Sequence, residues 1–496
     1  MIDTEAMRCK ILENALKGQI SDTLIADENV ANLINLLRMQ KEECIKKGLI
    51  SKDKKALPIT EKETPFLIPA AWSWVRIGDI FYHNTGKALN SSNTEGNTYE
   101  YITTSNVYWD RFELNELKTM LFTESEIEKC TVKKDDLLVC EGGDIGRAAI
   151  WNFDEEIKIQ NHIHRLRPYV EICVRFYYYV FLYYKKIGRI NGKGIGLQGL
   201  STNVLHELIV PLPPRGIQWK IAEKIDEIFE QLEIIDELQR NYVADIKALK
   251  NKLFDVAVQG KLSEQLLEDG TAEELYTKIQ IEKTALMQEG KIKKEKALPE
   301  IIEEDMPFDI PKNWKWVRLG EISWFQGGYA FKSNLYVEDS DNQIIRLGNV
   351  KQNALLLDAR PVFISDELAS EVEDYRIREN DILITMTGTR RKKDYFYAKC
   401  VEQSDLQGKK LYLNQRVGCI RVVDGVYPQF LVIALRNTEI RKIIFERETG
   451  AVNQGNLGSE DIKKFVYIPL PPYAEQIRIV EQIREVISCG QIMHLK

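Results

Sequence analysis

Residues 218–262 read QWKIAEKIDEIFEQLEIIDELQRNYVADIKALKNKLFDVAVQGKL, and this stretch decides the fold. Its apolar residues recur in alternating steps of four and three, with Lys, Glu and Asp between them. The resulting seam consists of Ile221, Ile225, Ile228, Leu232, Ile235, Tyr242, Ile246, Leu249, Leu253 and Val256. Only Gln239 interrupts it. A heptad pattern sustained over this length predicts a coiled-coil helix, which needs a partner helix.

The sequence before this stretch is repeated after it. The segment around Trp72 reads IPAAWSWVRIGDI, and the segment around Trp314 reads IPKNWKWVRLGEI. At the same offset, LENALKGQIS (Leu12–Ser21) corresponds to FDVAVQGKLS (Phe254–Ser263). Self-similarity that keeps its order over such a distance predicts one fold used twice.

The repeated units combine strands and helices. DLLVCEG (136–142) and DILITMTG (381–388) are short apolar runs bounded by turn residues, which is typical of strands. The same holds for IHRLRP (163–168) and VGCIRV (417–422), whereas the tyrosine-rich residues 175–185 and their counterpart 428–436 favour short helices. We therefore expect an α+β fold with two similar mixed α/β domains, separated by a long antiparallel coiled coil.

The two ends of the chain repeat the two halves of the central helix. Residues 476–487, which follow the second PLPP motif, resemble the beginning of the central helix. Residues 7–21 resemble the end of that helix. Joined head to tail, the ends would form a second, interrupted copy of that helix. We therefore expect a pseudo-twofold, circularly arranged molecule in which both ends run antiparallel to the central helix. The charged helices 29–47 and 271–294 are predicted to present a solvated face.

Net charge, cysteine spacing and the distribution of apolar residues limit the classes of protein to which this chain can belong. The formal net charge is −7, so a nucleic-acid-binding surface would have to consist of local basic patches. The eight cysteines show no CxxC spacing, and no signal peptide or bilayer-spanning run is recognisable. These features predict a cytoplasmic protein. The sequence also lacks an NPPY or DPPF tetrad and a GxxxxGK[ST] phosphate loop.

Taken together, the chain resembles the specificity subunit of Type I restriction-modification systems. The resemblance covers almost the whole chain and depends on the order and duplication of its motifs. These are the WxWVRLGE-type segments Trp72–Asp79 and Trp314–Glu321, the DLLV and DILI strands, the PLPP motifs at Pro211 and Pro469, and the helix end Ala257–Gln265. The chain departs from the pattern at its C-terminus, because Ser488–Lys496 do not continue the heptads.

The resemblance implies a division of labour. Each globular unit would be a target recognition domain that reads one half of a split DNA sequence. The helices would set the spacing and carry two methyltransferase subunits, with restriction/translocase subunits added outside. The chain itself would be non-catalytic and bind no cofactor, with S-adenosylmethionine, ATP and Mg on the partner subunits.

The same resemblance assigns domain boundaries. We expect an N-terminal helical segment at 1–64 that completes the second conserved helix, the first recognition domain at 65–214, a central conserved helical region at 215–306, the second recognition domain at 307–472 and a short C-terminal conserved helix at 473–496.

Candidate DNA contacts in the second unit are loop residues that carry amide, hydroxyl or cationic groups. The TGTRRKK loop gathers four cations beside a glycine, and the amides suit adenine edges. A solvated hairpin and ordinary turn hydrogen bonding are the plain alternatives. The candidates are Asn349, Thr387, Thr389, Arg390, Arg391, Lys392, Lys393, Asn414, Gln415, Arg416, Asn453 and Gln454.

The corresponding positions of the first unit carry less charge. The GGDIGR loop has one Arg and one acid, and its glycines could allow close backbone approach or simply make a turn. The candidates are Ser105, Asn106, Gly143, Arg147, Asn161, His162, Lys193 and Gln198. The tyrosines of residues 177–184 are expected to pack in the core rather than stack on bases.

Two other classes of function compete with DNA recognition. A coiled-coil adaptor would bind protein rather than DNA. A self-sufficient nuclease or methyltransferase would need an atypical site, for example carboxylates such as Asp136, Glu141 and Asp144 around a metal ion. His162 and His164 stand two apart on a predicted strand, but no further ligands accompany them, so no metal site is expected.

Overall fold

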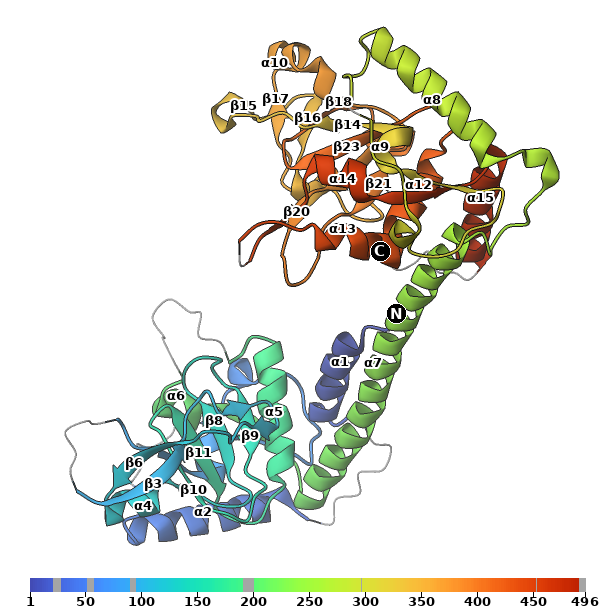
Figure 1. Cartoon of the computed structure of the whole chain (residues 1–496). Helices are drawn as coiled ribbons and strands as arrows, with labels where there is room; N and C mark the ends of the chain where they lie inside the picture. Colours follow the sequence, from blue (N-terminus) through green and yellow to red (C-terminus); the bar gives the residue numbers. More distant parts are fainter. Residues whose placement is uncertain are drawn as a thin grey trace. The chain divides into compact units, whose positions relative to one another are not determined.

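The computed structural model describes residues 1–20, 28–50, 58–89, 95–190, 200–295, 297–451 and 453–489. The chain forms two compact units, Met1–Arg240 and Asn241–Lys496, each with its own sheets and helices (Figure 1). One helix, α7 (Arg215–Val258), begins in the first unit and ends in the second.

The first unit is a mixed α/β structure with three main sheets. β1 (Ser73–Arg76) pairs with β12 (Ile209–Leu212). A four-stranded sheet has the order β2 (Phe81–Thr85), β11 (Ile163–Pro168), β8 (Leu137–Cys140) and β9 (Ala148–Ile150). Another has the order β6 (Lys118–Phe122), β3 (Asn97–Ile102), β10 (Ile157–Ile159) and β7 (Thr131–Val132), and β4 (Val107–Tyr108) pairs with β5 (Arg111–Phe112). The helices are α3 (Ile77–Ile80), α4 (Glu124–Cys130), α5 (Val174–Lys186) and α6 (Thr202–His206).

The second unit repeats this architecture. β13 (Lys315–Arg318) pairs with β25 (Tyr467–Leu470), and the next sheet has the order β14 (Ser323–Gly327), β23 (Val417–Val422), β19 (Ile382–Thr385) and β21 (Ala398–Cys400). The third sheet has the order β15 (Tyr336–Val337), β17 (Phe363–Ile364), β16 (Asn342–Ile345), β22 (Lys410–Leu413) and β18 (Arg376–Ile377), and β20 (Thr387–Gly388) pairs with β24 (Gly455–Asn456). The helices are α9 (Leu319–Ile322), α10 (Asp366–Glu371), α11 (Gln403–Leu406), α12 (Pro428–Arg436), α13 (Thr438–Glu446) and α14 (Ser459–Phe465). The prediction of one mixed α/β fold used twice is confirmed.

The predicted strands and helices lie where the sequence placed them. β11 and β23 coincide with the IHRLRP and VGCIRV runs, and α5 and α12 with the two predicted helices. The tyrosines of α5 are buried, as expected, because the helix packs against β9 and α1 inside the core (Figure 1).

The N-terminal helix α1 (Thr4–Leu16) runs antiparallel along the first part of α7 (Figure 1). Gln239 bonds to the backbone of Ile2, Asp236 accepts a hydrogen bond from Thr4, and the Arg8 guanidinium lies 5.9 Å from the centre of the Phe229 ring. Residues further along α1 therefore contact residues earlier in α7. The predicted antiparallel orientation of the N-terminal segment is confirmed.

The chain's own ends, which are predicted to form an interrupted partner helix, pack against only part of the seam. Ile221, Ile225 and Leu232 are buried, but Tyr242 and Leu249 are 50% and 52% exposed. In the second unit, the C-terminal helix α15 (Tyr473–Cys489) shares a hydrophobic core with Leu253, Phe254, Ala257 and Val258 at the end of α7. The described residues of the chain thus cover the two ends of the seam and leave its middle open.

A buried glutamine follows each PLPP motif and makes the same hydrogen bonds in both units. Gln218 accepts a hydrogen bond from Cys173 N (3.1 Å) and donates one to Pro213 O (2.8 Å). Gln476 accepts one from Tyr427 N (2.7 Å) and donates one to Pro471 O (3.0 Å). Because a buried amide is stable only when its groups are paired, each glutamine fixes the start of its helix to the β-unit before it.

The charged spacer helices present a solvated face, as predicted, and pack against the rest of the chain with their other face. α2 (Val30–Lys46) buries Val30, Leu33 and Leu37, and α8 (Ala272–Gln288) buries even Lys283. The Lys283 ammonium donates to Ser323 O (3.0 Å) and pairs with Glu295 (2.9 Å). A buried lysine needs such partners, so α8 is anchored to the second unit by charge as well as by packing.

Candidate nucleic-acid interface

The TGTRRKK loop of the second unit lies beside the loop that precedes α14. β20 pairs with β24 in antiparallel register, with Thr387 opposite Asn456 and Gly388 opposite Gly455. The register therefore brings Thr389 next to Gln454, although more than sixty positions separate them in the sequence. The sequence predicted these groups separately, and the β20–β24 pair brings them together.

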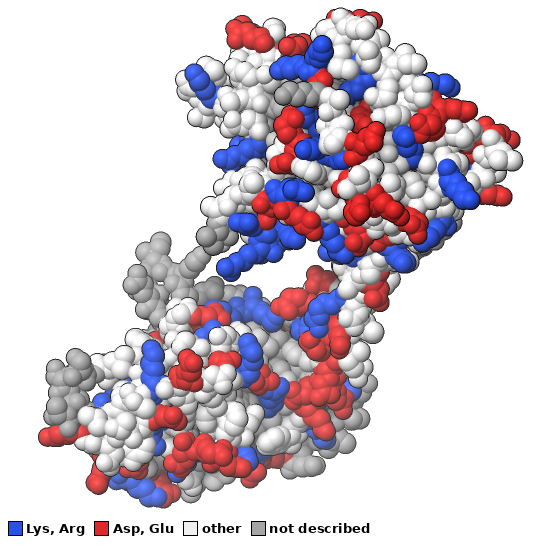
Figure 2. All heavy atoms as spheres, viewed as in Figure 1, with Lys and Arg blue, Asp and Glu red and all other residues white. Residues whose placement is uncertain are grey.

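The four cations of this loop have different environments. Arg391 and Lys392 are exposed, and their side chains make no hydrogen bond or ion pair with the described residues. Lys393 lies 5.5 Å from the centre of the Phe445 ring. Figure 2 shows Lys and Arg side chains gathered on the side of the second unit where Figure 1 places β20. The loop therefore carries a local positive patch on an acidic chain.

Arg390 differs from its neighbours because it is held by the protein. Its Nε donates to Glu448 Oε2 (3.2 Å) and its Nη1 donates to Gly450 O (3.2 Å). Thr389 N donates to Asp394 Oδ1 (2.7 Å), and this hydrogen bond lowers the pKa of Asp394. Burial, followed by the hydrogen bond to Glu448, raises the pKa of Tyr395, which donates to the other oxygen of Glu448. Sequence reasoning missed Glu448, because it is distant in the chain and carries no motif.

A second predicted group sits at the end of the same sheet. Val417 pairs with Thr385, so the turn formed by Asn414, Gln415 and Arg416 lies where β19 leads into β20. Gln415 and Arg416 are exposed. These residues and the TGTRRKK loop therefore occupy one edge of the second unit.

The turn packs closely against a glycine, Gly328, that was not among the residues predicted from the sequence. A Cβ on Gly328 would overlap Asn414 O, and a Cβ on Gly86 of the first unit would overlap Ile159 O. The two glycines occupy equivalent positions of the repeat, so their match could have identified them.

Two predicted amides have structural roles instead. Asn349 is only 2% exposed, and it donates to Leu356 O (2.8 Å) and accepts from Arg346 N (2.9 Å). Asn106 likewise donates to Glu113 O (2.9 Å) and accepts from Thr103 N (2.9 Å). Because the turn uses their hydrogen-bonding groups, we omit Asn349 and Asn106 from the interface.

The structure describes six of the eight residues predicted in the first unit. Asn161 and His162 occupy the turn before β11, and His162 lies 3.6 Å from the Glu141 carboxylate. Ser105 and Gly143 are exposed, the latter with φ +70° and open space around its Cα. Arg147 donates to Thr104 O (2.5 Å) and lies over the Tyr108 ring. Lys193 and Gln198 lie outside the described residues.

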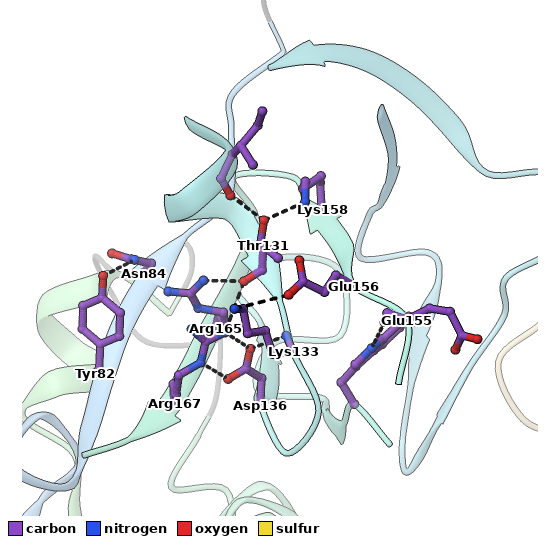
Figure 3. A network of polar contacts seen from close by, with 12 residues as sticks. Tyr82, Asn84, Thr131, Lys133, Asp136, Glu155, Glu156, Lys158, Arg165 and Arg167 are labelled. Atoms are coloured by element: carbon purple, nitrogen blue, oxygen red, sulfur yellow. Dashed lines mark hydrogen bonds and ion pairs between the residues drawn. The ribbon is translucent and has the colours of Figure 1, made fainter. Parts of the chain in front are cut away.

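The carboxylates once considered as metal ligands have other partners. Figure 3 shows Arg167 gripping buried Asp136, with Nε–Oδ1 and Nη2–Oδ2 distances of 2.7 and 2.6 Å. Glu141 lies beside His162, and Asp144 pairs with Lys185 (2.9 Å). Within the described ranges, no group of three or more His, Cys, Asp or Glu residues could hold a metal ion. The Asp136–Arg167 pair recurs as Asp381–Arg421, so it belongs to the shared fold.

Three histidines form a buried chain in the first unit. His164 Nε2 lies 2.6 Å from Leu200 O, His83 Nε2 lies 2.9 Å from His164 Nδ1, and His206 Nε2 lies 2.9 Å from His83 Nδ1. The carbonyl can only accept, so His164 Nε2 donates to it; with His164 and His83 neutral, His83 donates to His164 and His206 donates to His83. Burial, followed by the charges of His164 and His206, lowers the pKa of His83 to about 2. His164 therefore has both ring nitrogens hydrogen-bonded inside the first unit.

No helix among the described residues is both long and apolar enough to cross a bilayer.

Comparison with known proteins gives a consistent match to the duplicated architecture. A family model described as Type I restriction modification DNA specificity domain matches residues 69–241 and, a second time, 311–496. The Type I restriction enzyme EcoAI specificity subunit of Escherichia coli is 27% identical over an alignment of 551 residues, covering 99% of this chain and 90% of that protein. The EcoEI specificity subunit of the same species is 24% identical, with 98% and 89% covered.

A solved chain supports the fold. It comes from a structure whose description reads "Structural basis underlying complex assembly and conformational transition of the type I R-M system". The TM-score is 0.52 at 16% sequence identity, with 86% of this chain and 93% of that chain covered. At this identity the likeness concerns the fold alone.

Proposed function

The chain belongs to the Type I restriction-modification DNA specificity domain family, and on this premise we propose that each of its two units reads one half of a divided DNA target. The chain is the DNA-recognition subunit of a restriction-modification complex, and catalysis lies with other subunits. The adaptor and the self-sufficient enzyme are not favoured.

The observation that carries the proposal is that both units have the same edge, at which two paired strands end. In each unit, the ends of two paired strands meet at polar turns: β8 and β11 in the first, β19 and β23 in the second. A loop closes over the turn in both, because Leu200 N donates to Glu141 O (3.3 Å) and Leu457 N donates to Met386 O (2.9 Å). Equivalent edges with different side chains suit two half-sites of different sequence.

The partners of such a subunit are double-stranded DNA and the other subunits of the complex. We propose that two methyltransferase subunits bind the helical region, with restriction/translocase subunits outside them. The open middle of the α7 seam, around Tyr242 and Leu249, supports a helical partner there, because exposed heptad residues favour pairing with another helix. S-adenosylmethionine, ATP and Mg would be bound by the partners, and the complex would act in the cytoplasm.

The proposal is tested by mapping modified adenines across the host genome with single-molecule sequencing. We expect a split motif of two short half-sites with a fixed gap, which disappears when the gene is deleted and returns with a plasmid copy. A methylome that is identical with and without the gene would contradict the proposal.

A further inference from the structure

We propose that Arg390 reads a guanine in the half-site of the second unit and that Glu448 fixes the Arg390 guanidinium for this contact. The inference rests on the proposed DNA-recognition function and assigns a base type and two residues to it.

The guanidinium is held from the protein side. Glu448 Oε2 accepts from Arg390 Nε, and Gly450 O accepts from Nη1, both at 3.2 Å. The Glu448 side chain is 8% exposed, whereas that of Arg390 is 44% exposed. Nη2 makes no hydrogen bond with the described residues. One part of the guanidinium is therefore fixed while the other remains available to a ligand.

Glu448 is itself fixed beneath the loop. Its other oxygen accepts a hydrogen bond from Tyr395. A Cβ on Gly455 would overlap Glu448 Oε1, and a Cβ on Gly388 would lie 2.7 Å from the Tyr395 side chain. Glycine on both strands of the β20–β24 pair thus makes room for Glu448 and Tyr395, and the pair supports Arg390.

The chemistry favours a base over a phosphate. A guanidinium presents a planar set of donors that matches the O6 and N7 acceptors of guanine in the major groove. Reading those atoms requires fixed orientation, which a buttressing carboxylate supplies. A phosphate contact gains little from orientation and loses attraction beside an acid. The exposed Arg391 and Lys392, which have no such acid bonded to them, suit phosphates better.

The described residues of the first unit form no equivalent arrangement. In its GGDIGR loop, Asp144 pairs with Lys185 (2.9 Å), and Arg147 points to Thr104 O and the Tyr108 ring. No carboxylate among the described residues holds Arg147 toward the surface. The inference therefore concerns the half-site of the second unit alone.

The experiment uses the full chain assembled with its methyltransferase partners. Adenine methylation is measured on duplexes that carry the wild-type motif and on duplexes with one base pair of the second half-site changed at a time. Arg390→Ala and Arg390→Lys should lose discrimination at one G·C position by about 5- to 100-fold, the range of one bidentate base contact, with other positions unaffected. The lysine variant keeps the charge but cannot form the planar fork.

Glu448→Gln should weaken discrimination at the same position while binding to unrelated DNA stays equal or tightens, because a negative charge is removed. Lys392→Ala is the matched control. It should weaken binding evenly across sequences and reduce the salt dependence by about one counterion. Tyr395→Phe removes one support of Glu448 and should give a smaller loss at the same position.

Several results would overturn the inference. Arg390→Lys that retains full discrimination would make Arg390 a phosphate contact, and Arg390→Ala that weakens every sequence equally would do the same. Co-purification of each variant with its methyltransferase partners shows that it folds and assembles. If the wild-type complex methylated no split motif, the proposed function itself would fail, which is a separate result.

Discussion

At the scale of single residues, the first unit contains an acid-sensitive chain of imidazoles. His83, His164 and His206 are hydrogen-bonded in series, and burial lowers the pKa of His83 and of His164 below that of a free histidine. The unfolded chain, with histidine pKa values of about 6.5, binds protons that the folded first unit rejects. The chain has only five histidines, and the second unit carries one of them, His494, outside the described residues.

We therefore expect the first unit to lose stability as the pH falls below about 6.5, since a folded pKa lower than the unfolded one stabilises only above the unfolded value. Hydrogen exchange followed by mass spectrometry at pH 7.5, 6.5 and 5.5, corrected for the intrinsic exchange rate, separates the two units. Peptides of β2 and β11 should lose protection over this range, and the matching strands β14 and β23 should change much less. Equal losses in both units would contradict the role of the histidines.

At the scale of elements, the helix ends are attached to the β-units through glycine. Gly18 follows α1 and Gly260 follows α7, with φ of +70° and +67°. A Cβ on either would overlap a proline, Pro69 or Pro311, next to Trp72 or Trp314. This contact explains why the sequence repeats a glycine motif and a Pro–Trp motif together.

Gly18→Ala and Gly260→Ala should therefore destabilise the protein more than Gly48→Ala and Gly290→Ala. All four positions have φ near +70°, where a side chain costs about 1–2 kcal/mol. Only the first two also meet the proline, which adds about 1–3 kcal/mol of overpacking. Urea unfolding of the four variants measures the difference, and equal losses in both pairs would show that the proline contact relaxes freely.

At the scale of the whole molecule, the repeat makes the two units exchangeable. The same contacts occur at both junctions: glycine against proline and tryptophan at the beginning, and a buried glutamine after the PLPP motif at the end. A unit moved to the other position would find the same attachments.

A chain in which residues 307–472 replace residues 65–214 should consequently fold and direct methylation to a motif with two equal half-sites. If the units are related by the predicted twofold axis, these half-sites will be inverted relative to each other. Methylome sequencing of a strain that carries this chain with its partner subunits provides the readout. A direct repeat would contradict the twofold relation, and an unchanged first half-site would contradict the assignment of one half-site to each unit.

The sequence by itself determined the duplicated mixed α/β fold and the long central helix. These features depend on local patterns, such as heptad spacing, strand-length apolar runs and repeated Gly, Pro and Trp positions, which can be recognised along the chain. The antiparallel position of α1 also followed, because the N-terminal segment repeats the end of α7.

Only the tertiary structure decided which of the predicted side chains remain available to DNA. Asn349 is a predicted recognition amide, but its side chain donates a hydrogen bond to Leu356 O within its own turn. Arg147 donates to the backbone carbonyl of Thr104. Glu448 had no signal in the sequence, yet it orients Arg390 across a separation of 58 positions. The physical reason is that hydrogen-bond partners and burial arise from residues distant in sequence, whereas local patterns report only which element a residue belongs to.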